Sequence, residues 1–352
     1  MGQDVTRRIY LDHAATTPLL SVAQTAMERG FAAWANPSSP HAEGRGARAL
    51  IEESRGRIKA ALGWDGALIF TSGASEALAI ALTRAKVTGV LAGATEHDAV
   101  LRHVPEDRRL PVDVHGCVKL PEEIAPGTLF AIQQVNSETG AIQPLDALAE
   151  AIHAAGGFLL ADCSQGAGKL PLPRSADMIV LSAHKLGGPI GIGALLVRDL
   201  ALLSPSGGQE QGYRAGTEAM PLALGFAAAL EAPRDWLGEV ADWRARLDAA
   251  IAASGGEVVA SNAQRLPTIA SYRMAGKSAQ AQLIRFDMAG VAVSAGSACS
   301  SGTLRPSAVL TAMGWDATAA GEVIRVSMGH STVETDVDAF LAQWHALHSA
   351  VT

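Results

Sequence analysis

Short apolar runs that end abruptly in polar or small residues recur along this chain and alternate with helical patterns. One run, Met-Ile-Val-Leu at 178–181, leads into Ser-Ala-His-Lys at 182–185 and then into a glycine turn. Another run, 158–161, ends in Asp162. Apolar runs of this length predict buried strands whose carboxyl ends carry the polar side chains. Their alternation with helices predicts an α/β fold with a mostly parallel central sheet and helices on both faces.

The remaining pattern divides the chain into two parts, and its 352 residues are enough for two domains. Further strands are expected at 67–70, 89–92, 130–135 and 192–197, with helices at 21–35, 41–62 and 145–155. Beyond them, 218–254 is expected to be helical throughout, and short strands at 268–272, 291–293 and 324–327 indicate a smaller α+β unit. We therefore expect a large domain at 14–236 and a small domain formed by 1–13 and 237–352.

A strand that ends in an acid, together with a strand that ends in a lysine, fits a site for pyridoxal 5'-phosphate (PLP). The amine of Lys185 can hold the cofactor aldehyde as a Schiff base. A buried Asp162 can keep the pyridine nitrogen protonated, so that the ring acts as an electron sink. A surface lysine and a helix-capping aspartate would explain these two residues equally well, and the rest of the chain has to decide.

Gly73, Ala74 and Ser75 stand between the strand expected at 67–70 and a helix. Small residues at this point let backbone N–H groups face an anion at the helix N-terminus, and Ser75 adds a hydroxyl. An ordinary strand–helix turn with a serine cap is the alternative. Because PLP requires a phosphate cradle, this turn and the two strand ends support each other.

Four further polar residues each have a functional and a structural interpretation. His97, after the strand at 89–92, either stacks on a cofactor ring and moves protons or lies on the surface. Asn136 either orients substrate or cofactor or forms a turn. Thr217 is either a second phosphate contact or part of a flexible glycine-rich loop. Arg325 stands alone in an apolar strand, where it either binds a substrate carboxylate or forms a structural salt bridge.

Cys299 stands in a run of serine, glycine and alanine at 294–302, without apolar neighbours to bury it. An exposed thiol there can ionise and act as a nucleophile. Cys117 and Cys163 are expected to be spectators. Three cysteines are too few for a disulfide framework and indicate a reducing, cytoplasmic setting.

Charge and hydropathy argue against several other classes of protein. A net charge of −7 makes a nucleic-acid partner unexpected. No uninterrupted apolar run is long enough to span a bilayer, and residues 1–17 carry charges and lack the apolar core of a secretory signal. No metal site and no membrane partner are expected.

Taken in order, these segments resemble the cysteine desulfurases of the NifS/IscS type, which are PLP enzymes of fold type I in the class V aminotransferase group. The matching motifs run from Tyr-Leu-Asp-His-Ala-Ala-Thr-Thr-Pro at 10–18 to Ile-Arg-Val-Ser at 324–327, and they include 36–39, 71–74, 95–97, 135–136 and 168–171. Each motif alone is weak, but the ordered set covers nearly the whole chain and is specific.

The resemblance implies a role for each matching residue. Around the cofactor ring, Lys185 would be the Schiff-base lysine, Asp162 the pyridine-nitrogen partner, Gln165 the donor to the phenolic oxygen, and His97 the stacking and proton-moving residue. Around the phosphate would lie Gly73, Ala74, Ser75, Ser182 and His184, with Thr217 reaching the cofactor of the second subunit in a homodimer. Asn136 and Arg325 would bind the carboxylate of the substrate, L-cysteine. Cys299 would take the sulfur as a persulfide, releasing alanine.

The activity implied by the resemblance is desulfuration of L-cysteine, with sulfur delivered to a protein acceptor, as in iron–sulfur cluster assembly. The chain departs from the family pattern at Ser137, where a second asparagine is common, and it is shorter around 102–119. These departures leave the acceptor less defined than the core chemistry. The alternatives are a related PLP enzyme (a selenocysteine lyase, a cysteine lyase or an aminotransferase) and a PLP-binding relic without enzymatic activity. Persulfide on Cys299 and turnover of cysteine to alanine distinguish them.

Overall fold

The computed structural model describes residues 7–298, 304–305 and 307–349. The first part of the chain contains β1 (Ile9–Tyr10), α1 (Ser21–Ala32), α2 (Ala42–Leu62), β2 (Ala67–Thr71), α3 (Ala74–Arg84), β3 (Gly89–Gly93), α4 (Asp98–Leu101), η1 (Glu106–Arg108), β4 (Arg109–Leu110), β5 (Thr128–Gln133), α5 (Leu145–Ala154), β6 (Phe158–Asp162), β7 (Met178–Ser182), η2 (Ala183–Lys185), β8 (Gly193–Val197), η3 (Leu200–Leu202), η4 (Glu210–Gly212) and α6 (Met220–Glu231). The second part contains α7 (Trp236–Ala253), β9 (Glu257–Val258), β10 (Ile269–Arg273), α8 (Ala279–Met288), β11 (Val291–Ala292), β12 (Ser297–Ala298), β13 (Leu304–Arg305), α9 (Ala308–Ala312), α10 (Ala317–Ala320), β14 (Val323–Ser327) and α11 (Glu334–Ser349).

The first part is built around a seven-stranded sheet with the strand order β2-β8-β7-β6-β5-β3-β4. Its strands run parallel except β8, which is antiparallel to both of its neighbours. Only residues 183–192 join β7 to β8, and a parallel strand would need a longer crossover. The predicted α/β fold with a mostly parallel central sheet is confirmed.

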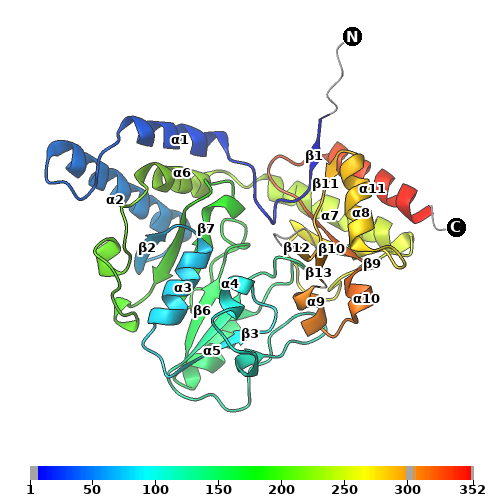
Figure 1. The fold of residues 1–352 in the computed structure, drawn as a ribbon, viewed down its shortest axis with the longest axis horizontal. Coiled ribbons are helices and arrows are strands. Elements are labelled where there is room, and N and C mark those ends of the chain that lie inside the picture. The colour runs from blue at the N-terminus through cyan, green and yellow to red at the C-terminus, as the bar shows by residue number, and fades with distance from the viewer. Residues whose placement is uncertain (1–6, 299–303, 306, 350–352) are drawn as a thin grey trace, which may run out of the picture.

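Side chains alternate between two apolar layers along each strand of this sheet. On β2, Leu68 and Phe70 pack into the layer that α1, α2, α5 and α6 share, whereas Ile69 packs into the opposite layer with α3 and α4. Figure 1 shows α1, α2 and α6 gathered beside one another, away from α3 and α4. Because both faces are covered, the strands read as continuous apolar runs in the sequence. Helices on both faces were predicted and are confirmed.

A second, separate core surrounds the three-stranded antiparallel sheet β14-β10-β9. The helices α7, α8 and α11 lie beside this sheet, away from the large one (Figure 1). In this core the rings of Phe286 and Phe340 stack at 4.9 Å, and Tyr272 and Trp344 are fully buried. The strand β1 pairs with β11, so the N-terminal segment joins this second unit before it crosses to the first. The predicted boundaries of the two domains stay a prediction.

The expected helix at 218–254 is wrong as a single element. The chain forms α6 and then α7, and Ala232, the residue after α6, has extended backbone angles. The next residue is Pro233, whose ring clashes with helical backbone before it and which has no N–H to donate. The other expected strands and helices are present, with ends that shift by a few residues, as in β5.

Candidate active site

Two neighbouring strands bring the acid and the lysine to the same edge of the large sheet. The parallel strands β6 and β7 pair with Asp162 opposite Val180, so both carboxyl ends lie at the same edge and β7 extends two residues beyond β6. Ser182 is the last residue of β7, and the single turn of η2 that follows carries Lys185. The negative charge of Asp162 acts on the amine of Lys185, which places both groups in one electrostatic environment.

The amine of Lys185 is held by main-chain carbonyl groups from a distant segment. Its Nζ donates hydrogen bonds to the oxygen atoms of Ala14 at 2.6 Å and Ala15 at 2.8 Å. Burial, followed by the positive charge of Arg325, lowers the pKa of Lys185 from 10.5 to about 8, against the opposing charges of two carboxylates. A lysine with this pKa is partly neutral, and hence nucleophilic, near neutral pH.

The segment 12–17 organises the site from the side of the second unit. In addition to the contact of Ala14 with the lysine amine, the Ala14 oxygen accepts a hydrogen bond from Nε2 of Gln165 at 2.9 Å. The hydroxyl of Thr17 donates to the main-chain oxygen of Lys185 at 3.1 Å. The motif at 10–18 did not by itself predict that this segment forms part of the site. A sequence signal for this role is present, because small and hydroxyl residues follow directly after a short strand, as they do at the other strand ends of the site.

Two acidic side chains, Asp162 and Glu96, lie near each other at this edge of the sheet. Oδ1 of Asp162 accepts hydrogen bonds from the amide of Ser164 at 2.9 Å and from its hydroxyl at 2.5 Å, which fix the orientation of the carboxylate. Glu96 is buried, and its Oε1 accepts a hydrogen bond from the amide of Gln133 at 2.9 Å. Burial, with the charge of Asp162, raises the pKa of Glu96 well above its usual range. A neutral Glu96 adds no second negative charge beside Asp162.

A second half-buried lysine, Lys169, contacts the main chain of the site. Nζ of Lys169 donates to the main-chain oxygen atoms of Gln165 and Lys185, both at 3.1 Å. Burial, and then the charges of Lys185 and Arg234, lower the pKa of Lys169 to about 7. Lys169 lies in the motif at 168–171, for which the sequence predicted no function. In the structure it links the main chains of Gln165 and Lys185, two of the predicted cofactor-binding residues.

The predicted phosphate cradle lies at the same edge, next to the end of β7. The first residue of β8, Gly193, pairs with Thr71 on one side and with Ser182 on the other. A Cβ atom on Gly193 would approach the main chain of Gly73 to 2.8 Å, so only glycine permits this close packing. A Cβ on Gly73 would meet nothing within 4 Å, which shows open space at the start of α3. Ser75 is exposed at this point, and binding of a phosphate group there stays a prediction.

The two histidines predicted for the site have different environments. His97 is exposed and caps α4, because its Nδ1 accepts a hydrogen bond from the amide of Ala99 at 3.0 Å. When this ring is neutral, its proton is therefore on Nε2. Nδ1 of His184 lies 3.1 Å from the hydroxyl of Thr16. Burial, and then the charge of Lys185, lower the pKa of His184 to about 4, so this ring would hold a phosphate by hydrogen bonding and not by charge.

The two predicted substrate-binding residues already have structural partners. Oδ1 of Asn136 accepts hydrogen bonds from the amides of Glu138 and Thr139, both at 2.9 Å, as in a turn. Its amide nitrogen gives one hydrogen to a main-chain carbonyl at 3.2 Å. Arg325 forms a salt bridge to Asp12, with 2.7 Å between the nitrogen and the oxygen. The roles of Asn136 and Arg325 toward a substrate stay predictions.

Two predicted residues are not brought to this edge by the described part of the chain. Thr217 is exposed in the loop between η4 and α6. The same loop is anchored by Glu210, which pairs with Arg55 at 2.7 Å and accepts a hydrogen bond from the amide of Phe70 at 2.8 Å. Cys299 lies outside the described residues, so its predicted role as sulfur acceptor stays a prediction.

Comparison with known proteins identifies the family of this chain. The family model described as "Aminotransferase class-V" matches residues 9–340, which include both strand ends and the segment 12–17. The chain belongs to the aminotransferase class-V family. The predicted membership in this family of enzymes is confirmed.

The relatives that match are named in the same way as the predicted family. A protein from Cereibacter sphaeroides named cysteine desulfurase is 34% identical, covering 95% of this chain and 94% of its own length. A protein from Archaeoglobus fulgidus named cysteine desulfurase IscS 1 is 33% identical and covers 94% of each chain. The predicted resemblance to cysteine desulfurases is therefore confirmed.

Solved structures agree with the fold. A NifS-like protein from Rickettsia africae superposes with a TM-score of 0.87 at 26% identity, covering 97% of this chain and 100% of that one. The structure titled "SspA in complex with cysteine" superposes with a TM-score of 0.79 at 28% identity, covering 92% and 100%. Fold type I, with the large sheet and the second unit together, is confirmed.

None of the helices at 7–298 and 307–349 is long and apolar enough to cross a membrane. Across the same described ranges, no three or more His, Cys, Asp or Glu side chains gather as a metal ion would require.

Proposed function

We propose that this protein is a PLP-dependent cysteine desulfurase, which converts L-cysteine to L-alanine and takes the sulfur onto Cys299 as a persulfide. The observation that carries the proposal is the set of charges around Lys185. There, a lysine amine with a lowered pKa shares its surroundings with the carboxylate of Asp162 and the guanidinium of Arg325. The names of the relatives and the family match support the same conclusion.

The residues present fit PLP. Lys185 would hold its aldehyde carbon, Asp162 its pyridine nitrogen, and the start of α3 with Ser182 its phosphate. Gln165 is buried, and its Nε2 uses one hydrogen for the main-chain oxygen of Ala14, which leaves the second hydrogen for the phenolic oxygen; its acceptor Oε1 has no partner. When bound, PLP would supply an electron sink for the α-carbon of an amino acid.

The chain's own residues then have distinct tasks. The neutral Nζ of Lys185 takes the α-proton of the substrate, and the carbonyl groups of Ala14 and Ala15 stabilise the ammonium that results. Arg325 binds the substrate carboxylate, assisted by the second amide hydrogen of Asn136. His97, with its proton on Nε2, can donate that proton at the exposed side of the site.

The sulfur step falls to Cys299. Its thiolate forms a bond to the substrate sulfur while the carbon–sulfur bond breaks, and the electron pair of that bond stays with the carbon fragment. Protonation of this fragment gives alanine. The sulfur is then passed to a protein acceptor by thiol exchange, which suits a reducing cytoplasmic location.

The test is mass spectrometry of the PLP-loaded protein after brief exposure to L-cysteine, with alanine measured in parallel. We expect one additional sulfur on the peptide that contains Cys299 and a matching amount of alanine. The variant Cys299→Ser should keep the cofactor but form no persulfide, and Cys117→Ser is the matched control. Alanine with an unmodified Cys299, and with the sulfur released as elemental sulfur or, in the presence of an added thiol reductant, as sulfide, would instead identify a lyase. Unchanged sulfur transfer by Cys299→Ser would overturn the assignment of the acceptor thiol.

We further propose that the protein is a homodimer in which Thr217 reaches the partner's cofactor. Large apolar side chains are exposed along α1 and beyond it, with Phe31 at 60% and Trp34 at 82% exposure, and Ile190 is 75% exposed on the same unit. Exposed apolar groups at this density mark interaction surfaces. Trp34→Glu should give a monomer by light scattering, whereas Met288→Glu, on α8, should not. A dimeric Trp34→Glu protein would contradict this interface.

A further inference from the structure

Asp12 directs its carboxylate toward the guanidinium of Arg325. The two side chains form a salt bridge of 2.7 Å between Oδ1 and Nη2, and they are only 20% and 8% exposed. An arginine–carboxylate pair removed from water in this way holds its geometry more firmly than a surface pair. Neither the resemblance nor the comparisons give Asp12 a role.

The guanidinium of Arg325 keeps donors that its present partners do not use. Its Nη1 donates to the main-chain oxygen of Ser137 at 3.0 Å, and Nη2 donates to Asp12. A guanidinium has five N–H donors, so donors remain for a further anion. The carbonyl of Ser137 fixes one corner of the group, and the Asp12 carboxylate fixes the other.

The main chain of Asp12 leads directly to the groups that hold the lysine amine. Its carbonyl oxygen accepts hydrogen bonds from the amides of Ala15 at 3.1 Å and Thr16 at 3.4 Å, which close a turn. Within this turn lie the carbonyl groups of Ala14 and Ala15 that bind Nζ of Lys185. One short turn therefore anchors both the guanidinium and the amine.

We propose that Asp12 is a positioning residue that fixes the guanidinium of Arg325 to receive the α-carboxylate of the amino-acid substrate. This inference rests on the proposed function, because it assigns Arg325 to an amino-acid carboxylate. The negative charge of Asp12 also balances the positive charge of Arg325 near Lys185. The site can therefore attract a carboxylate without repelling the protonated amine of Lys185.

The charges around Lys185 give this proposal a second readout. The Arg325 charge lowers the pKa of Lys185, and the Asp12 charge raises it. Removal of the Asp12 charge should therefore lower the pKa of Lys185 below about 8. The reactivity of Lys185 in the apoprotein toward an aldehyde reagent, measured as a function of pH, would report this change in pKa.

The experiment titrates the PLP-loaded Cys299→Ser protein with L-cysteine and with cysteamine, which lacks the carboxylate, and follows the absorbance of the bound cofactor. In that background, Asp12→Asn should weaken L-cysteine binding by about tenfold, the effect of losing one charged hydrogen bond, and leave cysteamine unchanged. Asp338→Asn is the matched control, because Asp338 pairs with Arg246 at 2.9 Å on the surface of the second unit. Asp12→Glu should restore part of the L-cysteine affinity.

Equal effects on both ligands, or no effect on either, would overturn the role of Asp12. An unchanged pH profile of lysine reactivity in Asp12→Asn would also count against it. If Asp12→Asn fails to fold, the comparison of Asp12→Glu with the parent protein still decides, because the longer side chain should weaken L-cysteine and not cysteamine. A parent protein with Cys299 that binds L-cysteine but forms no alanine would overturn the proposed function alone.

Discussion

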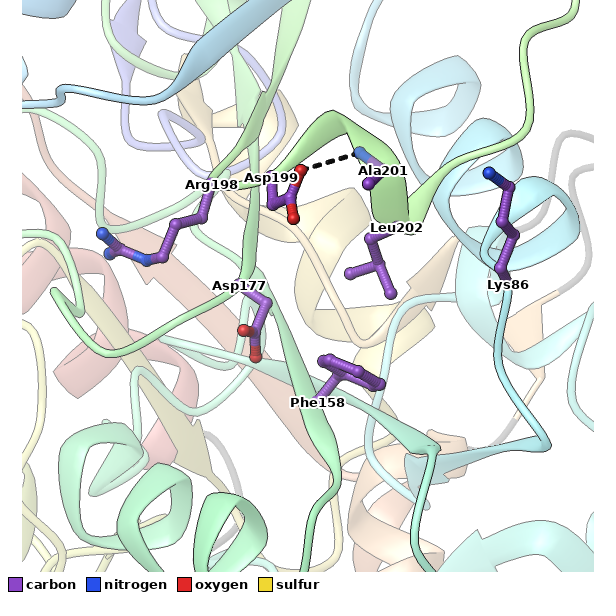
Figure 2. Close-up of a pocket in the computed structure, with 7 residues that line it drawn as sticks. All are labelled: Lys86, Phe158, Asp177, Arg198, Asp199, Ala201 and Leu202. Carbon is purple, nitrogen blue, oxygen red and sulfur yellow. Dashed lines mark hydrogen bonds between the residues drawn. The ribbon is translucent and has the colours of Figure 1, made fainter.

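Phe158 and Asp162 lie at the two ends of the same strand, β6, about 13 Å apart by the rise of a strand. At the carboxyl end, the strand opens onto the candidate site. At the amino end, it opens onto a hollow that Phe158, Asp177 and Leu202 line together with Lys86, Arg198, Asp199 and Ala201 (Figure 2). Both ends carry acids and cations, but those groups are used in different ways.

At the hollow, the carboxylates serve the fold. Oδ2 of Asp177 accepts a hydrogen bond from the amide of Leu159 at 2.8 Å and lies 2.9 Å from Nε2 of His153. Asp199 caps η3 through the amide of Ala201 at 2.8 Å, the dashed line in Figure 2. The cations there, Lys86 and Arg198, are exposed.

At the carboxyl end, by contrast, the amine of Lys185 is removed from water and its pKa is lowered to about 8. Desolvation of a charged group costs free energy, which a protein does not spend at a purely structural position unless a partner offsets it. We therefore place the proposed active site at the end that carries the half-buried, partly neutral amine of Lys185, and not at the hollow.

The largest expected difference comes from replacing one lysine at each end of the sheet with alanine. Lys185→Ala should lose the covalent bond to PLP and reduce alanine formation by about a thousandfold or more, because both the nucleophile and the base are lost. Lys86→Ala should change it by less than about twofold, as expected for an exposed residue away from the chemistry. The measurement is alanine released per enzyme with L-cysteine. Comparable losses in the two variants would remove the distinction between the ends.

Substitution of an aspartate at each end should give the next largest difference in turnover. Asp162→Asn keeps the size of the side chain but cannot stabilise a protonated pyridine nitrogen, so we expect turnover to fall by about a hundredfold with PLP still bound. Asp177→Asn, at the hollow, is its control and should affect the melting temperature more than turnover. Turnover and the absorbance of bound PLP are measured for both. Normal turnover in Asp162→Asn would contradict its role.

A third prediction concerns pH. The amine of Lys185 must be neutral to react with an aldehyde, and its pKa is lowered from 10.5 to about 8. The rate at which the apoprotein takes up PLP should therefore rise with pH and reach half of its maximum near pH 8. Stopped-flow absorbance measures this rate. A midpoint near 10.5 would show that the lysine is not desolvated in solution.

The smallest effect is expected at the hollow itself. Asp199→Ala removes the cap of η3 and should lower the free energy of unfolding by about 1 kcal/mol, with turnover unchanged. Chemical denaturation and the alanine assay measure the two quantities. A large loss of turnover would indicate that this end of the sheet also serves the reaction.

Much of the large unit could be predicted from the sequence. Local periodicity marks β6 and β7 as buried strands, and the parallel βαβ arrangement then brings their carboxyl ends to one edge. The positions of Asp162 and Lys185 at strand ends follow from that rule. Pro233 was also readable as a helix break, but the strong apolar pattern on both sides of it led to the prediction of one helix.

The tertiary structure decided what those strand ends contact. Asp12 and Arg325 are separated by 313 positions in the chain, and no local pattern predicts that they pair. The same is true of Ala14 and Lys185, which are 171 positions apart. Such contacts depend on how the two cores pack and on where the segment 12–17 crosses between them. The sequence determined which side chains end the strands, because strand propensity and burial are local. Only the packed structure determined the partners, and hence the charge on each group, because desolvation and Coulomb interactions depend on distance in space.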